Sequence, residues 1–180
     1  VLVKEGFISV IPPVIVKEKA MQGLGYLSGG GEEDTYHFVK DKQYFVGTSE
    51  QSVIPMHMDE ILSEDELPKR YVAFSTCFRR EAGSYGKDTH GILRVHQFDK
   101  VEMISITKPG TSDKEQEYLL SLQEKLVSSL KLPYRITQVC TGDLSYQSAR
   151  TFDLECEVSA GCEYRETHSL SNCTDFQARR

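Results

Sequence analysis

The fold of this chain is decided by one stretch, STCFRREAGSYGKDTHGILRVHQFDKVEM, at residues 75–103. An extended run at residues 71–78 leads into it, a loop with three glycines follows, and a second extended run covers residues 94–106. Strand, polar loop and strand in this order predict a β-hairpin with a long connection. A connection of this length without structure of its own is usually functional or disordered. We therefore expect an antiparallel strand pair with a candidate functional loop.

The returning strand places polar and aromatic side chains on one face, because side chains alternate with a period of two. That face would carry Arg94, His96, Phe98, Lys100 and Glu102. On the outgoing strand, Arg79 and Glu81 would also share a face. Guanidinium groups bind phosphate in a bidentate manner, so this set suits a ligand with a phosphate, a flat base and an ammonium or hydroxyl group. A solvated face of salt bridges is the alternative, and the pattern alone leaves both open.

Length and composition are those of one ordinary domain, because 180 residues with 39% hydrophobic content can build a core. No apolar run is long enough for a transmembrane helix, and the first residues are a poor match to a signal peptide. Five cysteines without a C-x-x-C pair argue against a disulfide framework and against a thiolate zinc site. We expect a cytoplasmic protein that does not associate with a membrane.

The formal net charge of −6 disfavours a general nucleic-acid coat protein, because such proteins need positive charge to release counterions from phosphates. The charge still allows a local basic patch. Arg80, Lys87 and Arg94 in and around the loop could guide one end of an RNA.

Helices are expected at three places. Residues 17–24 form a short one, and residues 48–62 form a second whose first turn has a hydroxyl residue placed to cap it. The third begins with SDKE at residues 112–115, which has the capping-box form, and continues with apolar residues at helical spacing. These apolar residues are Tyr118, Leu119, Leu122, Leu126 and Leu130.

Strands and turns account for most of the remaining chain. We expect an extended run at 6–13 that ends in two prolines, a turn at 29–34, a small hairpin of 36–40 and 43–46, and strands at 134–140, 151–158 and 162–167. The chain would then have an α+β fold with a mostly antiparallel sheet flanked by helices.

The segment FRREAG followed by GILRVHQFDKVEM resembles motif 2 of the class II aminoacyl-tRNA synthetases and, within them, of the seryl-tRNA synthetases. Three further blocks agree in order: GTSE at 47–50, LPYR and CTGDLSYQSARTFDLE within 132–155, and YRETHSLSNCTDFQARR at 164–180. The resemblance implies that residues 1–180 are a partial class II catalytic domain, which holds the end of motif 1 and motif 2 and is incomplete at both ends. Motif 3 and the N-terminal tRNA-binding arm would be absent, so we expect a fragment with weak or no activity.

The activity implied by this resemblance is that of a ligase. L-serine would be activated by ATP to seryl-adenylate and then transferred to the 3′ end of tRNA(Ser), with Mg²⁺ as the cofactor. tRNA(Sec) is a second candidate acceptor, and the full-length protein would be a homodimer. Two alternatives remain: a ligase that loads an amino acid on a carrier protein, and a non-catalytic synthetase paralogue that acts as a binding module.

The resemblance also assigns roles to individual residues. Arg79 would bind the α-phosphate and the serine carboxylate, and Arg94 would bind the outer phosphates of ATP. Glu81 would accept a hydrogen bond from the adenine amino group, and Phe98 would stack under the base. The catalytic residues would be Arg79, Glu102 and Glu166. The serine site would consist of Thr48, Ser49, Glu50, Arg79 and Glu102. The ATP site would consist of Arg79, Arg80, Glu81, Arg94, Val95, Phe98, Glu166, Thr167, His168 and Ser169.

Carboxylate and phosphate oxygens together suit Mg²⁺, and the resemblance assigns the metal to Glu166 and Ser169. Without the resemblance, Glu166 would be interpreted as an exposed carboxylate on a strand. Thr48 and Glu50 would be interpreted as a helix cap and as an acidic residue in the first helical turn. His168 and Leu170 depart from the family pattern, and His168 would place a titratable imidazole beside the metal and phosphate site.

Overall fold

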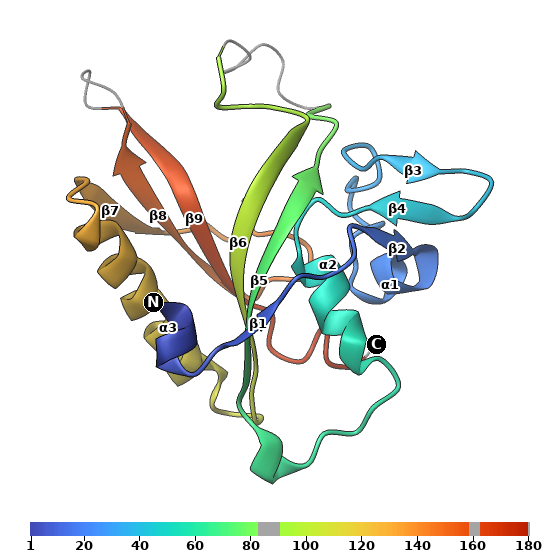
Figure 1. The fold of residues 1–180 in the computed structure, drawn as a ribbon, viewed down its shortest axis with the longest axis horizontal. Helices are drawn as coiled ribbons and strands as arrows, with labels where there is room; N and C mark the ends of the chain where they lie inside the picture. The colour runs from blue at the N-terminus through green and yellow to red at the C-terminus, as the bar shows by residue number, and fades with distance from the viewer. Residues whose placement is uncertain (83–90, 159–162, 180) are drawn as a thin grey trace. The chain divides into compact units, whose positions relative to one another are not determined.

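The computed structural model describes residues 1–82, 91–158 and 163–179 (Figure 1). The chain divides into two compact units, residues 1–106 and residues 107–179. In the described ranges, no helix combines the length and the apolar character that crossing a bilayer requires.

The first unit is built on the predicted hairpin. β5 (Lys69–Phe78) pairs antiparallel with β6 (Gln97–Ile106), and β1 (Ile8–Val10) lies parallel to β5 on its other edge (Figure 1). The hairpin prediction is confirmed, although β6 begins three residues later than expected. Arg94 and His96 therefore precede the strand, while Phe98, Lys100 and Glu102 share one face of it, as predicted.

The backbone after β5 differs from the expectation that Arg79 and Glu81 share a strand face. β5 ends at Phe78, and Glu81 has a left-handed backbone with φ 55°. The cause is a tertiary partner, Asp34, because its carbonyl oxygen accepts from the Arg80 N–H at 2.8 Å and its carboxylate accepts from the Ala82 N–H at 3.2 Å. These bonds take the place of a strand ladder.

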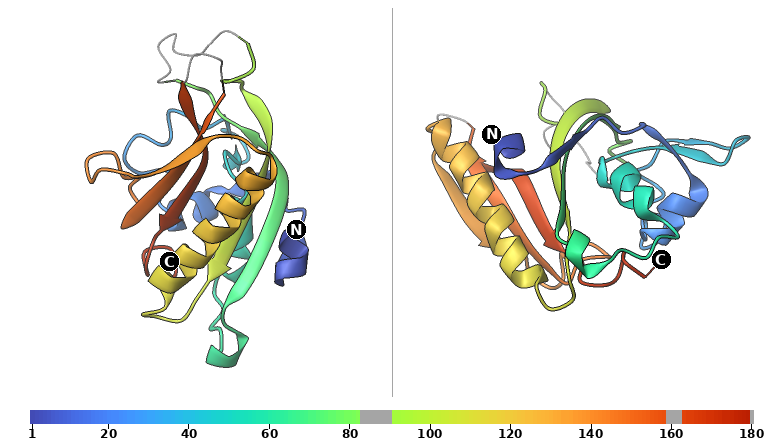
Figure 2. Two further views of the ribbon diagram at one scale, coloured as in Figure 1. Left: turned by 90° about the vertical axis from the view of Figure 1, so that its left-hand side faces the viewer. Right: turned by 60° about the horizontal axis from the view of Figure 1, so that its bottom comes forward.

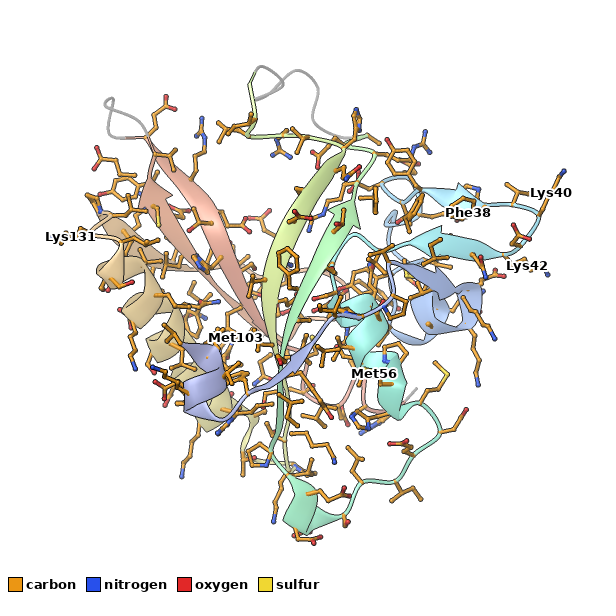
Figure 3. The ribbon with its side chains drawn as sticks, in the orientation of Figure 1. Phe38, Lys40, Lys42, Met56, Met103 and Lys131 are labelled. Carbon is orange, nitrogen blue, oxygen red and sulfur yellow. The ribbon has the colours of Figure 1, made fainter. Side chains whose placement is uncertain are left out.

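A second small sheet carries the other strands of this unit. Its order is β2 (Ile15–Lys17), β4 (Gln43–Phe45) and β3 (His37–Phe38), all antiparallel, and α1 (Glu18–Gly23) follows β2 directly. The predicted short helix and the predicted small hairpin are thus confirmed. Figure 3 shows Lys40 and Lys42 extending from the tip of this hairpin.

The helix predicted at 48–62 is much shorter. α2 covers Glu50–Val53, and a 3-10 helix, η2 (Ile54–His57), replaces its continuation. Pro55 has no N–H to donate to the helix, which accounts for the early end. Two further 3-10 turns, η1 (Leu2–Glu5) and η3 (Glu64–Glu66), complete the unit.

The second unit packs one helix on an antiparallel sheet. The order is β7 (Tyr134–Gln138), β8 (Arg150–Glu157) and β9 (Tyr164–Asn172), and α3 (Ser112–Ser129) lies along one face of it (Figure 2). The core on that face contains Val127 of α3 with Leu154 and Cys156 of β8. The α+β class with mostly antiparallel sheets is confirmed.

Two details of α3 differ from the sequence expectation. The predicted capping box is not formed, because the helix is capped at Thr111 without a side-chain bond and the Ser112 hydroxyl accepts from Asn172 Nδ2 at 3.2 Å instead. Leu130 follows the last helical residue and is 67% exposed, whereas Val127, absent from the predicted apolar set, is buried. Leu119 and Leu122 are buried as expected.

Candidate active site

The predicted polar face of β6 is half-buried at Phe98, Lys100 and Glu102. Its residues oppose the buried Cys77, Ser75 and Ala73 of β5, and the same face continues into a core with Ile104. Large apolar side chains are exposed on the other face instead, among them Phe74 and Val101. The face is therefore not a fully solvated row of ion pairs, because its Lys100–Glu102 pair is 35% and 13% exposed.

Glu102 is the centre of this face, and its side chain is only 13% exposed. Its Oε2 accepts from the Thr48 hydroxyl at 2.5 Å, from the Ser49 hydroxyl at 2.7 Å and from the Glu50 N–H at 3.2 Å. Its Oε1 accepts from Lys100 Nζ at 3.1 Å. Four donors on one carboxylate satisfy a charge that would otherwise be costly to bury.

The same contacts explain why no hydroxyl caps α2. Ser49 occupies the N-cap position without a side-chain cap bond, because its hydroxyl and that of Thr48 are both directed at Glu102. The expectation of a capping hydroxyl is wrong for this reason.

The environment of Glu102 favours its charged form. Burial raises the pKa of this carboxyl, but the charge of Lys100 and the hydrogen bonds from Thr48, Ser49 and Lys100 outweigh it, so the pKa lies below its usual value. Glu102 is therefore an anion at neutral pH, which allows it to accept hydrogen bonds from a hydroxyl or an ammonium group.

Lys100 is the residue that the site assignment from sequence missed. It donates to Thr48 Oγ1 at 2.9 Å as well as to Glu102. The signal was present, because Lys100 stands two positions before Glu102 on the same strand face.

Arg79 and Phe98 lie together at the end of this strand pair. The Arg79 guanidinium carbon is 5.2 Å from the centroid of the Phe98 ring, within the range of a cation–π contact. Arg79 Nε donates to the Gly47 carbonyl at 3.2 Å, and its backbone N–H donates to His96 at 3.0 Å. The guanidinium is thus held beside the aromatic ring, next to the segment that carries Thr48.

Two further predicted residues pair with each other beyond the strand ends. Arg94 Nη1 donates to Glu81 Oε2 at 2.9 Å. Arg80, next to Glu81 in the chain, is exposed, and Val95, next to Arg94, is half-buried. Lys87, predicted to guide RNA, lies outside the described residues.

The four predicted residues of the second unit lie on β9, which extends to Asn172 and is longer than expected. The register pairs Glu166 with Glu155 and Ser169 with Asp153, and it shifts by one residue at Thr167. This bulge turns Glu166 and Ser169, three positions apart, to the same sheet face. On a regular strand they would face opposite sides.

His168 does not lie on that face. It pairs with Leu154, whose buried side chain packs against α3, so His168 points to the helix side and away from the face of Glu166 and Ser169. Burial lowers the pKa of His168, and its Nδ1 is 2.9 Å from the Thr167 hydroxyl. The expected imidazole beside a metal is therefore not found. Among the described residues, no group of three or more His, Cys, Asp or Glu side chains is arranged to hold a metal.

Curated proteins similar to this chain are serine–tRNA ligases. The curated relatives include the serine–tRNA ligases of Acidothermus cellulolyticus (53% identical over 99% of this chain and 42% of the relative) and Cutibacterium acnes (51% identical over 97% of this chain and 41% of the relative). The chain thus spans about two-fifths of the length of these relatives.

Solved structures similar to this chain include enzymes of the same kind as these relatives. The seryl-tRNA synthetase of Pyrococcus horikoshii complexed with ATP matches with a TM-score of 0.94 and 42% identity, over 99% of this chain and 40% of that one. The cytoplasmic serine–tRNA ligase of Naegleria fowleri in complex with AMP matches with a TM-score of 0.91 and 35% identity, over 99% of this chain and 43% of that one.

The family itself follows from the match of a family model. The model of the tRNA synthetase class II core domain (G, H, P, S and T) covers residues 36–180, well over half of the sequence. This chain belongs to the class II tRNA synthetase core domain family.

Proposed function

We propose that the protein is a serine–tRNA ligase, which activates L-serine with ATP and transfers it to the 3′ end of tRNA(Ser). The observation that carries this proposal is the buried carboxylate of Glu102, held by the Thr48 and Ser49 hydroxyls on the sheet face that also bears Phe98. A buried acceptor of this kind suits a small polar amino acid, because an analogue without the hydroxyl would leave the remaining acceptor position of Glu102 unfilled. The named relatives support the same assignment.

In the first half-reaction, a carboxylate oxygen of serine attacks the α-phosphorus of ATP. The bond from the α-phosphorus to the bridging oxygen breaks, and pyrophosphate leaves with the electron pair. Arg79 would neutralise charge on the α-phosphate, and Phe98 would stack on the adenine, so the residues act by position and charge. In the second half-reaction, a hydroxyl of the terminal ribose attacks the seryl carbonyl and AMP leaves.

The binding of ATP requires a rearrangement of one ion pair under this proposal. Glu81 is assigned to the adenine amino group and Arg94 to the outer phosphates, and the two side chains bond to each other at 2.9 Å in the structure. The Arg94 side chain is 45% exposed and that of Glu81 is 17% exposed, and a pair with one solvated partner can be exchanged for ligand contacts at a small cost in stability.

Magnesium fits the oxygen donors of β9. The bulge at Thr167 places the Glu166 carboxylate and the Ser169 hydroxyl on one face together with Asp153, whose Oδ1 is buried without a hydrogen-bond partner. Such oxygen donors are those that Mg²⁺ prefers. When bound, the ion neutralises charge on the phosphate oxygens of ATP. Glu166 and Ser169 would hold it.

The remaining parts of the proposal rest on family resemblance. They are tRNA(Sec) as a second acceptor, a homodimer as the assembly, and the cytoplasm as the place of action.

The test is serine-dependent exchange of pyrophosphate into ATP, followed by transfer to tRNA(Ser). We expect exchange with serine and little with alanine or threonine. Arg79→Ala should lose about 100-fold or more in rate, by the usual loss of one charge-stabilising donor. Lys40→Ala, at the tip of the β3–β4 hairpin, is the matched control and should keep the wild-type rate.

The outcomes separate the alternatives. Exchange without transfer to tRNA(Ser) would point to a ligase that loads a carrier protein. The proposal is refuted if the complete protein is folded but shows no pyrophosphate exchange and, by calorimetry, binds neither serine nor ATP. That result would favour a binding module.

A further inference from the structure

Lys100 contacts two residues of the proposed serine site at once. Its ammonium donates to Thr48 Oγ1 at 2.9 Å and to Glu102 Oε1 at 3.1 Å, and its side chain is 35% exposed. An ammonium group can only donate, so Thr48 must accept this bond with a lone pair. The single proton of the Thr48 hydroxyl then points to Glu102 Oε2, where the distance is 2.5 Å. Lys100 therefore fixes the direction in which Thr48 donates.

The acceptor capacity of Glu102 is almost filled by these contacts. A carboxylate offers about four lone-pair sites, two on each oxygen. Oε2 receives Thr48, Ser49 and the Glu50 N–H, whereas Oε1 receives Lys100 alone among the described residues. Three donors thus share the two lone pairs of Oε2, whereas one lone pair of Oε1 receives no donor from the described residues and lies beside the positive charge of Lys100.

A site of this kind distinguishes the two donors of a serine molecule. The α-ammonium would meet the like charge of Lys100, whereas the neutral side-chain hydroxyl would not. The arrangement therefore favours the hydroxyl at Oε1.

We propose that Lys100 is a positioning residue of the serine site, which holds Glu102 and Thr48 in one hydrogen-bonding pattern and leaves Oε1 open for the serine hydroxyl. This inference rests on the proposed function. It assigns to Lys100 an effect on serine binding, and none on ATP binding.

Other charged and titratable groups surround Glu102 from each neighbouring element. Lys100 is on β6, Glu50 opens α2, Cys77 is on β5, and Arg79 follows β5. Burial raises the pKa of the Cys77 thiol, so this group stays neutral near pH 7. Lys100 is the cation that bonds directly to the carboxylate. Without it, burial would disfavour the charged form of Glu102, and the carboxyl would take up a proton at a higher pH.

The experiment measures KM for serine and for ATP by pyrophosphate exchange at pH 8 and pH 6 in the complete protein. In Lys100→Met, the serine KM should rise several-fold more between pH 8 and pH 6 than in the wild type, because the carboxyl that has lost its cation takes up a proton at a higher pH. The ATP KM should stay within about twofold of wild type, and Lys100→Arg, which keeps the cation, should restore most of the wild-type pH profile.

Two controls separate positioning from a general effect on stability. Lys69→Met removes a lysine from the far end of β5, where it pairs with Glu66, and should leave the serine KM unchanged. In a Glu102→Gln background, adding Lys100→Met should change the serine KM less than about twofold, because the charge that Lys100 holds is gone.

Nuclear magnetic resonance of the glutamate carboxyl carbons gives a readout that does not need activity. The Glu102 signal should titrate at higher pH in Lys100→Met, and not in Lys69→Met. If wild-type protein exchanges pyrophosphate but Lys100→Met keeps the wild-type pH profile, the inference about Lys100 is refuted. If wild-type protein shows no serine-dependent exchange, the proposed function fails instead, and an unshifted Glu102 signal would then refute the inference separately.

Discussion

Glu66 illustrates how a single side chain can be tuned at the surface by its neighbours. Its carboxylate accepts from Lys69 at 2.9 Å and from both the hydroxyl and the N–H of Ser63, and the bond from the Ser63 N–H belongs to the capping box of η3. The bond from Lys69 is the largest cause, followed by those from Ser63, and they lower the pKa of Glu66 from 4.5 to about 2. Glu102 reaches its charged state by a different route, because its donors must offset burial.

The first prediction concerns the titration of Glu66. Because its folded pKa lies below the ordinary value, the ionised group stabilises the fold above about pH 4.5, and this contribution is lost as the pH falls from there to about 2. Lys69→Met should raise the pKa of Glu66 toward 4.5 and move the acid unfolding transition to higher pH. Carboxyl resonance titration measures the first effect and circular dichroism the second. An unchanged Glu66 titration in Lys69→Met would contradict the assignment.

At the scale of elements, polar side chains join α3 to its sheet. Gln116 is 3% exposed, and its Nε2 donates to the Arg150 carbonyl at 3.2 Å and to the Leu170 carbonyl at 3.0 Å. Its Oε1 accepts from Arg150 Nε at 2.7 Å. One amide therefore connects the helix to both β8 and β9.

The second prediction is that Gln116→Leu, which keeps the side-chain volume, lowers the free energy of unfolding by about 1–3 kcal/mol, because Arg150 Nε and two carbonyls lose their partner. Glu117→Ala, an exposed position on the same helix, should change it by less than about 0.5 kcal/mol. Urea unfolding followed by circular dichroism compares the two. If Gln116→Leu and the wild type have equal free energies of unfolding, these hydrogen bonds make no net contribution to stability.

On the scale of the whole chain, each unit has a core of its own. Val53, Tyr71, Ala73 and Ile104 form one in the first unit, and Val127, Leu154 and Cys156 form one in the second. Leu154 has no exposed surface. Each unit therefore has its own source of hydrophobic stability.

The third prediction tests the core of the second unit. Leu154→Ala should cost about 2–5 kcal/mol in unfolding free energy, because it leaves a cavity between β8 and α3. Leu130→Ala is the matched control, since that leucine is 67% exposed, and should cost less than about 0.5 kcal/mol. Thermal unfolding measures both, and a small cost for Leu154→Ala would mean that the site collapses around the smaller side chain.

The fourth prediction concerns metal removal from the complete protein. Under the proposed function, chelation of Mg²⁺ should abolish pyrophosphate exchange, and added Mg²⁺ should restore it. Glu166→Gln should raise the Mg²⁺ concentration needed for half-maximal exchange by about 10-fold or more, as expected for the loss of one carboxylate ligand. His168→Gln should leave this Mg²⁺ concentration unchanged, because His168 lies on the helix side of β9. The reverse order of effects would overturn the assignment of the metal to Glu166.

The sequence by itself determined the family, the hairpin of β5 and β6, the common face of Phe98, Lys100 and Glu102, and the long helix α3. These features depend on motifs and on periods of 2 and 3.6 residues, which are local properties of the chain. Only the tertiary structure decided where the hydroxyls of Thr48 and Ser49 point, that the Ser112 capping box is not formed, and that β9 bulges at Thr167. In the first case, the competing partner is a buried carboxylate 54 residues from Thr48 and 53 from Ser49, and no local pattern records such a distant acceptor. A buried charge must be paired, and this demand overrides the local preference of a hydroxyl for a helix cap.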